Sequence, residues 1–139
     1  MYKSRLLNSK IIKILSIMGH TDQIAISDAG LPIPKNVERI DLALAFGVPS
    51  FIQVFESVSE SIQIEKVILA EEILEHNPEI HKKILEQIRQ VEKSQKNKID
   101  ITYITHEMLK IQTNECKAVI RTGECSPYAN IILQSGVIF

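Results

Sequence analysis

The sequence IAISDAGLPIP, residues 24–34, indicates the class of fold. It begins with a short apolar run bounded by polar residues, which is typical of a strand buried on both faces of a sheet. Two prolines and a glycine follow between positions 30 and 34. They exclude a helix interior and a central strand. The stretch therefore predicts a buried strand that ends at Ser27-Asp28 and leads into a loop of fixed shape.

Helical and strand patterns alternate on both sides of this segment. Before it, apolar residues at helical spacing predict a helix that Asn8 or Ser9 can cap and that Gly19 ends. After it, the patterns predict a helix at 40–46, a buried strand at 51–55, amphipathic helices at about 64–75 and around 80–91, a strand at 99–104, a helix that begins at His106, and strands at 118–120, 131–133 and 137–139.

This alternation favours an α/β fold. We expect one domain over residues 1–139, with three α/β/α layers around a central mixed, largely parallel sheet, because 139 residues suit a single core. No Gly-x-Gly-x-x-Gly pattern follows the first strand, so dinucleotide binding has no support.

Composition argues against several functional classes. A net charge of -1 gives no basic field for nucleic acid or anionic lipid, and the absence of Trp disfavours base stacking. No apolar run is long enough to cross a bilayer, and the basic start lacks the apolar core of a signal peptide. Two cysteines are too few for a disulfide framework. We therefore expect a cytoplasmic protein.

Two histidines stand at predicted helix ends. His20 follows the end of the first helix, with Asp22 and Asp28 nearby, and helix carbonyls and carboxylates both favour an imidazolium. His106 lies in the first turn of a helix, where the dipole favours the neutral ring. The pair suits an acid and a base. The alternatives are an exposed capping histidine at 20 and a surface helix residue at 106.

Polar groups also cluster in two predicted loops. Asp28 ends a buried strand, where it would bind a hydroxyl, orient a histidine or simply form a turn. The sequence SPYAN, residues 126–130, places a hydroxyl, a phenol and an amide directly before another strand. Such groups give directional hydrogen bonds without charge, as recognition of a neutral polyol requires. The alternative is a plain turn in which Tyr128 covers the core.

The remaining candidates are given structural roles. We expect His76 and His81 to be solvated and the cysteines to fill small apolar gaps. The four phenylalanines, Phe46, Phe51, Phe55 and Phe139, could lie in the core or at an interface, and we expect core positions. A zinc site would have to combine His20, His106, Cys116 and Cys125, whose separations match no compact ligand motif, so we expect no metal.

The chain resembles the D-ribose pyranase family from end to end. The resemblance lies in long, unusual segments: 19–22, 27–34 and 123–133, supported by 6–8, 39–41 and 47–51. It implies interconversion of the β-pyranose and β-furanose forms of free D-ribose, without metal or cofactor, by a ring-shaped homo-oligomer, often a decamer. It assigns the proton donor to His20 and the sugar contacts to Asp28, His106, Tyr128, Ala129 and Asn130.

Other functions stay open at this point. The nearest is a fucose-type mutarotase. From other classes come a non-catalytic sugar-binding partner of a ribose transporter or kinase, and a structural part of an oligomer.

Overall fold

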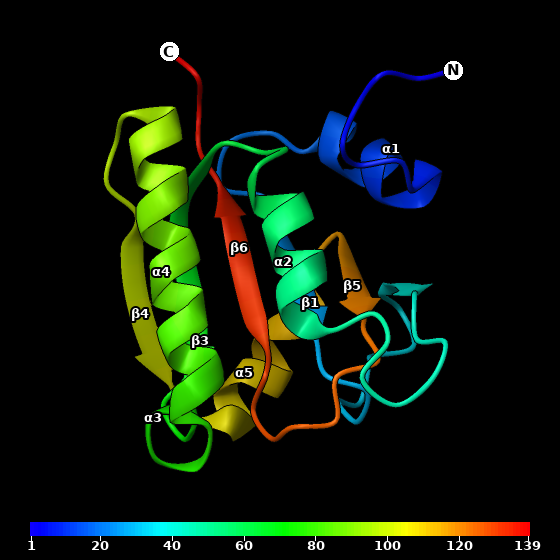
Figure 1. Cartoon of the computed structure of the whole chain (residues 1–139), viewed down its shortest axis with the longest axis vertical. Helices are drawn as coiled ribbons and strands as arrows, with labels where there is room; N and C mark the ends of the chain where they lie inside the picture. The colour runs from blue at the N-terminus through cyan, green and yellow to red at the C-terminus, as the bar shows by residue number, and fades with distance from the viewer.

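A single mixed sheet organises the chain, with its six strands in the order β2-β5-β1-β6-β3-β4 (Figure 1). A computed structural model describes residues 1–139. The strands are β1 (Gln23–Ser27), β2 (Glu38–Asp41), β3 (Ile64–Ala70), β4 (Asp100–Ile104), β5 (Ala118–Arg121) and β6 (Ile131–Ser135). β6 runs antiparallel to both of its neighbours, and all other paired strands are parallel. The predicted mixed, largely parallel sheet is confirmed.

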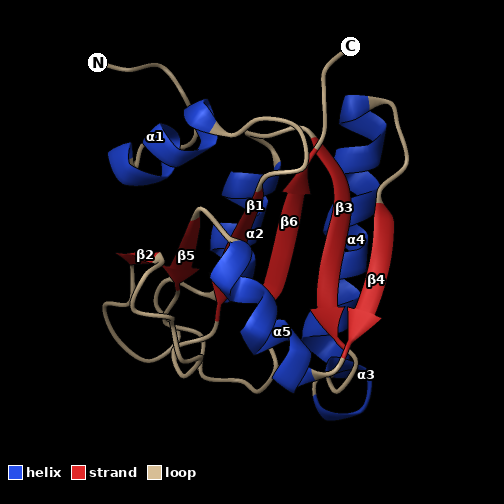
Figure 2. Cartoon of the chain, turned by 180° about the vertical axis from the view of Figure 1, so that it is seen from behind, coloured by secondary structure: helices blue, strands red, loops and turns tan.

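Helices cover both faces of the sheet. They are α1 (Ser9–Ile17), α2 (Phe51–Ser59), α3 (Ile73–His76), α4 (Pro78–Gln95) and α5 (His106–Gln112), followed by a short 3-10 turn at Thr113–Glu115. Figure 1 shows α2 and α4 in front of the sheet, and Figure 2, from behind, shows α5 in front of it. This is the predicted α/β/α layering, with a thin layer on the α5 side. No helix is both long and apolar enough to cross a membrane.

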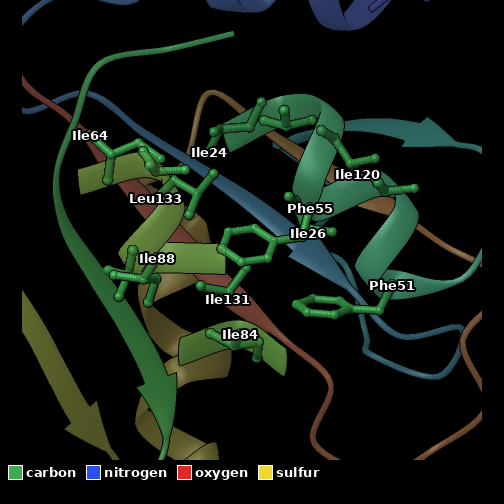
Figure 3. Close-up of a cluster of buried hydrophobic side chains, with 14 of the residues drawn as sticks. Ile24, Ile26, Phe51, Phe55, Ile64, Ile84, Ile88, Ile120, Ile131 and Leu133 are labelled. Carbon is green, nitrogen blue, oxygen red and sulfur yellow. The ribbon is translucent and has the colours of Figure 1, made fainter. Parts of the chain in front are cut away.

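Successive side chains along a strand point to opposite faces of the sheet and pack into two separate hydrophobic cores. In β1, Ile24 and Ile26 join the larger cluster under α2 and α4, whereas Ala25 joins a smaller cluster under α5. Figure 3 shows strand residues meeting Phe51 and Phe55 of α2 and residues of α4 in the larger cluster. Because both faces are buried, the strands read as continuous apolar runs.

The segment predicted as a strand at 51–55 is helix α2. Ser50 caps it through a capping box with Gln53, since each side chain bonds the other's backbone N–H. Phe51 and Phe55 then lie one turn apart, with ring centroids 5.9 Å from each other, and both are buried. Short apolar runs do not distinguish strand from helix, but the capping box was a usable signal.

The helix predicted at 64–75 was also wrong over most of its length. Residues 64–70 form β3, which pairs with β6 on one side and β4 on the other. Val67 and Leu69 face the larger core and Ile68 the smaller one, a period-two pattern that fits a strand. Only Ile73–His76 of the predicted helix is helical.

Two further predictions fail at the margins of the sheet. Residues 38–41 form β2, paired with β5, instead of the helix predicted at 40–46. Residues 137–139 pair with no strand, since the last strand of the sheet, β6, ends at Ser135. Phe46 and Phe139 lie outside the core and are 91% and 99% exposed, contrary to expectation.

The loop after β2 is held against the segment after β5 at Gly123. Gly47 N–H donates to the Gly123 carbonyl at 2.6 Å, and Gly123 N–H donates to the Pro49 carbonyl at 2.9 Å. A Cβ on Gly123 would lie 2.4 Å from the Val48 carbonyl oxygen and 2.6 Å from that of Ala45. Only glycine permits this approach of two backbones.

We therefore expect Gly123→Ala to lower the free energy of unfolding by about 1–3 kcal/mol, as for other overpacked positions. Gly19→Ala is the matched control, because its Cβ would meet only Asp22 Oδ2 at 3.8 Å. The control should change stability by less than about 0.5 kcal/mol. Urea unfolding at one protein concentration measures both; equal stabilities would contradict the backbone contact.

Candidate functional site

The carboxyl ends of the five parallel strands meet at one edge of the sheet, where β6 begins. In Figure 2 the arrows of β3 and β4 point to this lower edge, and that of β6 points away. Asp28 follows β1, His106 follows β4, and residues 128–130 precede β6. Ligands commonly bind at such an edge in α/β sheets. The fold thus brings together every predicted site residue except His20.

Asp28 and Asn130 form a closed pair across the β1–β6 boundary. Asn130 Oδ1 accepts from the Asp28 backbone N–H at 2.9 Å, and its Nδ2 donates to Asp28 Oδ2 at 3.0 Å. Asn130 is 1% exposed, so its amide is fixed by these partners. The pair sets the position of the Asp28 carboxylate relative to β6.

The other oxygen of Asp28 shapes the loop that follows. Its Oδ1 accepts from the backbone N–H of Gly30 at 2.9 Å and of Leu31 at 2.8 Å. Asp28 is therefore a turn former, as the simpler interpretation held, and it also lines a hollow with Gly30, Glu124, Ser126 and Pro127. Because Oδ1 is used by the loop, Oδ2 is the oxygen better placed to meet a ligand hydroxyl.

The ring of Tyr128 contacts two histidine rings. Tyr128 adopts a left-handed backbone at φ 58°, and its ring centroid lies 5.1 Å from that of His106, in a T-shaped arrangement, and 5.5 Å from that of His76. Nδ1 of His106 is buried and has no hydrogen-bond partner. An unpaired buried polar atom costs about 1–3 kcal/mol, so this nitrogen is a natural partner for a ligand donor or acceptor.

Side chains missed in the sequence hold these groups in place. Asn77 Nδ2 donates to Ser126 Oγ at 2.9 Å and to the Pro127 carbonyl at 2.8 Å, and Ser126 Oγ donates to Glu124 Oε1 at 2.8 Å. Glu72 accepts from the His106 backbone N–H at 2.9 Å. Ala129, fully buried, contributes backbone to the segment. No local sequence pattern links these distant partners.

His20 lies at the opposite edge of the sheet. The neighbouring Thr21 N–H donates to the carbonyl of Ser135, at the end of β6, at 2.9 Å. From Gln23 to Asp28 the chain advances roughly 17 Å at about 3.3 Å per residue. His20 is thus separated from the other site residues by the full length of a strand. Nε2 of His20 lies 2.8 Å from Oε2 of Glu65. The ring bonds neither Asp22 nor Asp28.

Among the lesser expectations, those for His81 and Cys125 are corrected, and those for His76 and Cys116 are confirmed. His81 is half-buried, and its Nε2 lies 2.6 Å from the hydroxyl oxygen of Tyr103. Burial lowers the pKa of His81 and raises that of Tyr103. Cys116 fills a gap as expected, and burial raises its pKa to about 12, but Cys125 is exposed. His76 is solvent-exposed as predicted, yet it packs on Tyr128. No cluster of three or more His, Cys, Asp or Glu side chains could hold a metal ion.

The sequence of this chain matches a known protein family. The model of the RbsD / FucU transport protein family matches residues 1–138. The chain belongs to this family. As a family member it is 56% identical to a D-ribose pyranase of Yersinia enterocolitica over 139 residues, with 100% of both chains covered.

Solved structures of family relatives show the same fold. The structure of Bacillus subtilis RbsD complexed with D-ribose has a TM-score of 0.91 and 45% identity, covering 100% of both chains. A fucose mutarotase of Streptococcus pneumoniae, in complex with L-fucose, has a TM-score of 0.76 and 24% identity, covering 95% of this chain and 94% of that one. At that identity the second likeness concerns the fold alone.

The Asp28–Asn130 pair predicts a pH-dependent variant. Asn130→Asp places a second carboxylate where Nδ2 now donates at 3.0 Å. We expect a loss of about 3–5 kcal/mol at neutral pH, as for a buried charge without a partner. The new carboxyl would have a folded-state pKa above its unfolded value of about 3.9. Stability would therefore be highest below that value and fall as the pH rises through the raised pKa.

Thermal melts of the variant at pH 5 and pH 7.5 measure this effect. Asn97→Asp is the control, because Asn97 is exposed and its Oδ1, which accepts from Gln63, is retained as a carboxylate oxygen. A Tm of Asn130→Asp that matches the control at both pH values would contradict the closed pair.

Proposed function

We propose that this chain is a D-ribose pyranase, an isomerase that interconverts the β-pyranose and β-furanose forms of free D-ribose. The observation that carries the proposal is the 56% identity over full length to a D-ribose pyranase. The relative with 45% identity and the same fold is a complex with D-ribose, which supports the same substrate. The activity would supply ribose to catabolism in a usable ring form.

The reaction needs two proton movements and no covalent intermediate with the protein. A base removes the proton from the anomeric hydroxyl while an acid protonates the ring oxygen O5. The C1–O5 bond then breaks and leaves an open-chain aldehyde. After rotation, the O4 hydroxyl attacks C1 and loses its proton, while the carbonyl oxygen gains one. Ring opening also proceeds unaided in water, so general acid–base help of about 100- to 10,000-fold suffices.

Roles for the individual side chains follow from their positions. In this proposal Asp28 Oδ2, the Tyr128 phenol and the segment 128–130 hold the sugar hydroxyls. His106, or a water that it holds, takes the anomeric proton through the unpartnered Nδ1. His20 delivers the proton to O5. Neutral hydrogen-bonding groups around Asp28 suit an uncharged polyol.

The position of His20 implies that a second copy completes the site. Within one chain His20 lies at the edge where β6 ends, whereas Asp28 and Asn130 lie where β6 begins. A sugar bound at Asp28 is therefore out of reach of the same chain's His20. We propose that His20 comes from a neighbouring copy in a homo-oligomer, of decameric size by family resemblance, in the cytoplasm. The exposed apolar side chains Leu44, Phe46 and Val48 are suited to contacts between copies.

The first test measures exchange between ring forms directly. Saturation-transfer NMR on ribose should show faster pyranose–furanose exchange with the wild-type protein, and His20→Ala should lose about 100-fold or more of that acceleration. L-fucose in the same experiment separates a mutarotase. Ribose binding by calorimetry without faster exchange would favour a non-catalytic binding protein and overturn the proposal.

A second test concerns the shared site. His20→Ala and Asn130→Ala each remove one half of it, so each homo-oligomer should be inactive. Mixed assemblies, made by joint refolding, should regain part of the exchange rate, because some interfaces combine an intact His20 with an intact Asn130. The matched control is a mixture of His20→Ala with the double variant, in which no interface is complete. Equal rates for the two mixtures would place both residues in one chain's site.

A further inference from the structure

One nitrogen of the His20 ring is already occupied. Nε2 lies 2.8 Å from Oε2 of Glu65, a residue 45 positions away in the sequence. Hydrogen bonds from Gln134 and from His20 hold the pKa of Glu65 below its ordinary value, so it is ionised at neutral pH. An ionised carboxylate only accepts hydrogen bonds. Nε2 therefore carries a hydrogen, and Nδ1 is the ring atom left free for proton exchange.

The backbone around Glu65 is arranged to direct its side chain. Ile64 pairs with Ser135 and Lys66 with Gln134, so Glu65 is the extra residue of a bulge between β3 and β6. Bulges re-aim side chains and are over-represented beside active sites. Across the bulge, a Cβ on Gly136 would lie 3.2 Å from that of Glu65. The glycine thus leaves room for the start of the Glu65 side chain.

A line of amides fixes the second oxygen of Glu65. Gln112 Nε2 donates to Gln23 Oε1 at 2.8 Å, Gln23 Nε2 donates to Gln134 Oε1 at 2.9 Å, and Gln134 Nε2 donates to Glu65 Oε1 at 2.8 Å. Gln23 and Gln134 each accept from one neighbour and donate to the next, so all three bonds run in the same direction. The line ends on a group that only accepts, which leaves Oε2 for His20.

The other charged groups at this edge do not bond the His20 ring. Asp22 Oδ2 accepts from the Gly19 backbone N–H at 2.9 Å, and its Oδ1 lies 3.5 Å from Lys117 Nζ. Lys66 acts electrostatically on Glu65 and lowers its pKa slightly further. Among these side chains Glu65 alone bonds the His20 ring.

We propose that Glu65 is the positioning residue of His20. Its carboxylate holds Nε2–H, stabilises the imidazolium and directs Nδ1–H toward the sugar. This inference rests on the proposed function, in which His20 protonates the ring oxygen. In that step the Nδ1–H bond breaks, the O5–H bond forms, and the electrons of the C1–O5 bond pass to O5. The imidazole becomes neutral and keeps its Nε2–H on Glu65.

The variant Glu65→Gln tests the charge without changing the size of the side chain. We expect kcat for ring exchange to fall about 10- to 100-fold, less than the full contribution of a general acid, with KM for ribose nearly unchanged. The pH profile of the rate should also differ from that of the wild type, because an amide replaces the carboxylate that bonds Nε2. Glu65→Asp should restore part of kcat. The control is Glu60→Gln, which removes only an exposed ion pair with Arg5.

A second readout does not depend on activity. Long-range 15N–1H spectra of the histidine rings should show the Nε2–H tautomer for neutral His20 in the wild type and a larger Nδ1–H population in Glu65→Gln, since an amide can donate to Nε2. An unchanged tautomer, or an unchanged kcat and pH profile, overturns the inference. The inference is also overturned if Glu65→Asp and Glu65→Gln lose the same amount of kcat and neither variant forms the homo-oligomer. If the wild type shows no exchange activity, the proposed function fails, and the spectra still decide whether Glu65 holds Nε2–H.

Discussion

The reversed direction of β6 is the constraint on which the site depends. Because β6 runs antiparallel between β1 and β3, its first residues lie at the carboxyl ends of the parallel strands. Residues 131–133 are fully buried on both faces of the sheet, so a slip of one residue would exchange their two core faces. Core packing therefore fixes the register, and the register brings the Asn130 side chain within hydrogen-bond distance of Asp28. A parallel strand in this place would carry the segment 126–130 to the other edge.

The direction of β6 also separates the groups suited to hold a sugar from His20. The groups suited to hold a sugar gather where β6 begins, and His20 with its carboxylate stands where β6 ends. On the proposed function, each chain carries the acid of one site and the contacts of another. A monomer would then be a correctly folded protein without a complete site, and assembly would be a condition of activity as well as of stability.

The polar residues at the sheet edge could be predicted from the sequence better than the side chains that hold them in place. Asp28 and His106 follow apolar runs, and Asn130 precedes one, so their convergence could be predicted once the strands were recognised. Phe51 and Phe55 were misassigned because a short apolar run fits either element, and tertiary packing decides between them. The Glu65–His20 pair could not be predicted at all. It depends on a bulge, and on a strand that the sequence pattern presented as a helix.

The two histidines of the proposed site have different surroundings, and this difference suits opposite roles. The ring of His20 bonds an ionised carboxylate. His106 instead has a T-shaped contact with the ring of Tyr128 and a buried Nδ1 without a hydrogen-bond partner. Within one chain these surroundings lie at opposite edges, so neither perturbs the other. On the proposed function, an acid and a base can then be set independently and meet where two copies join around the sugar.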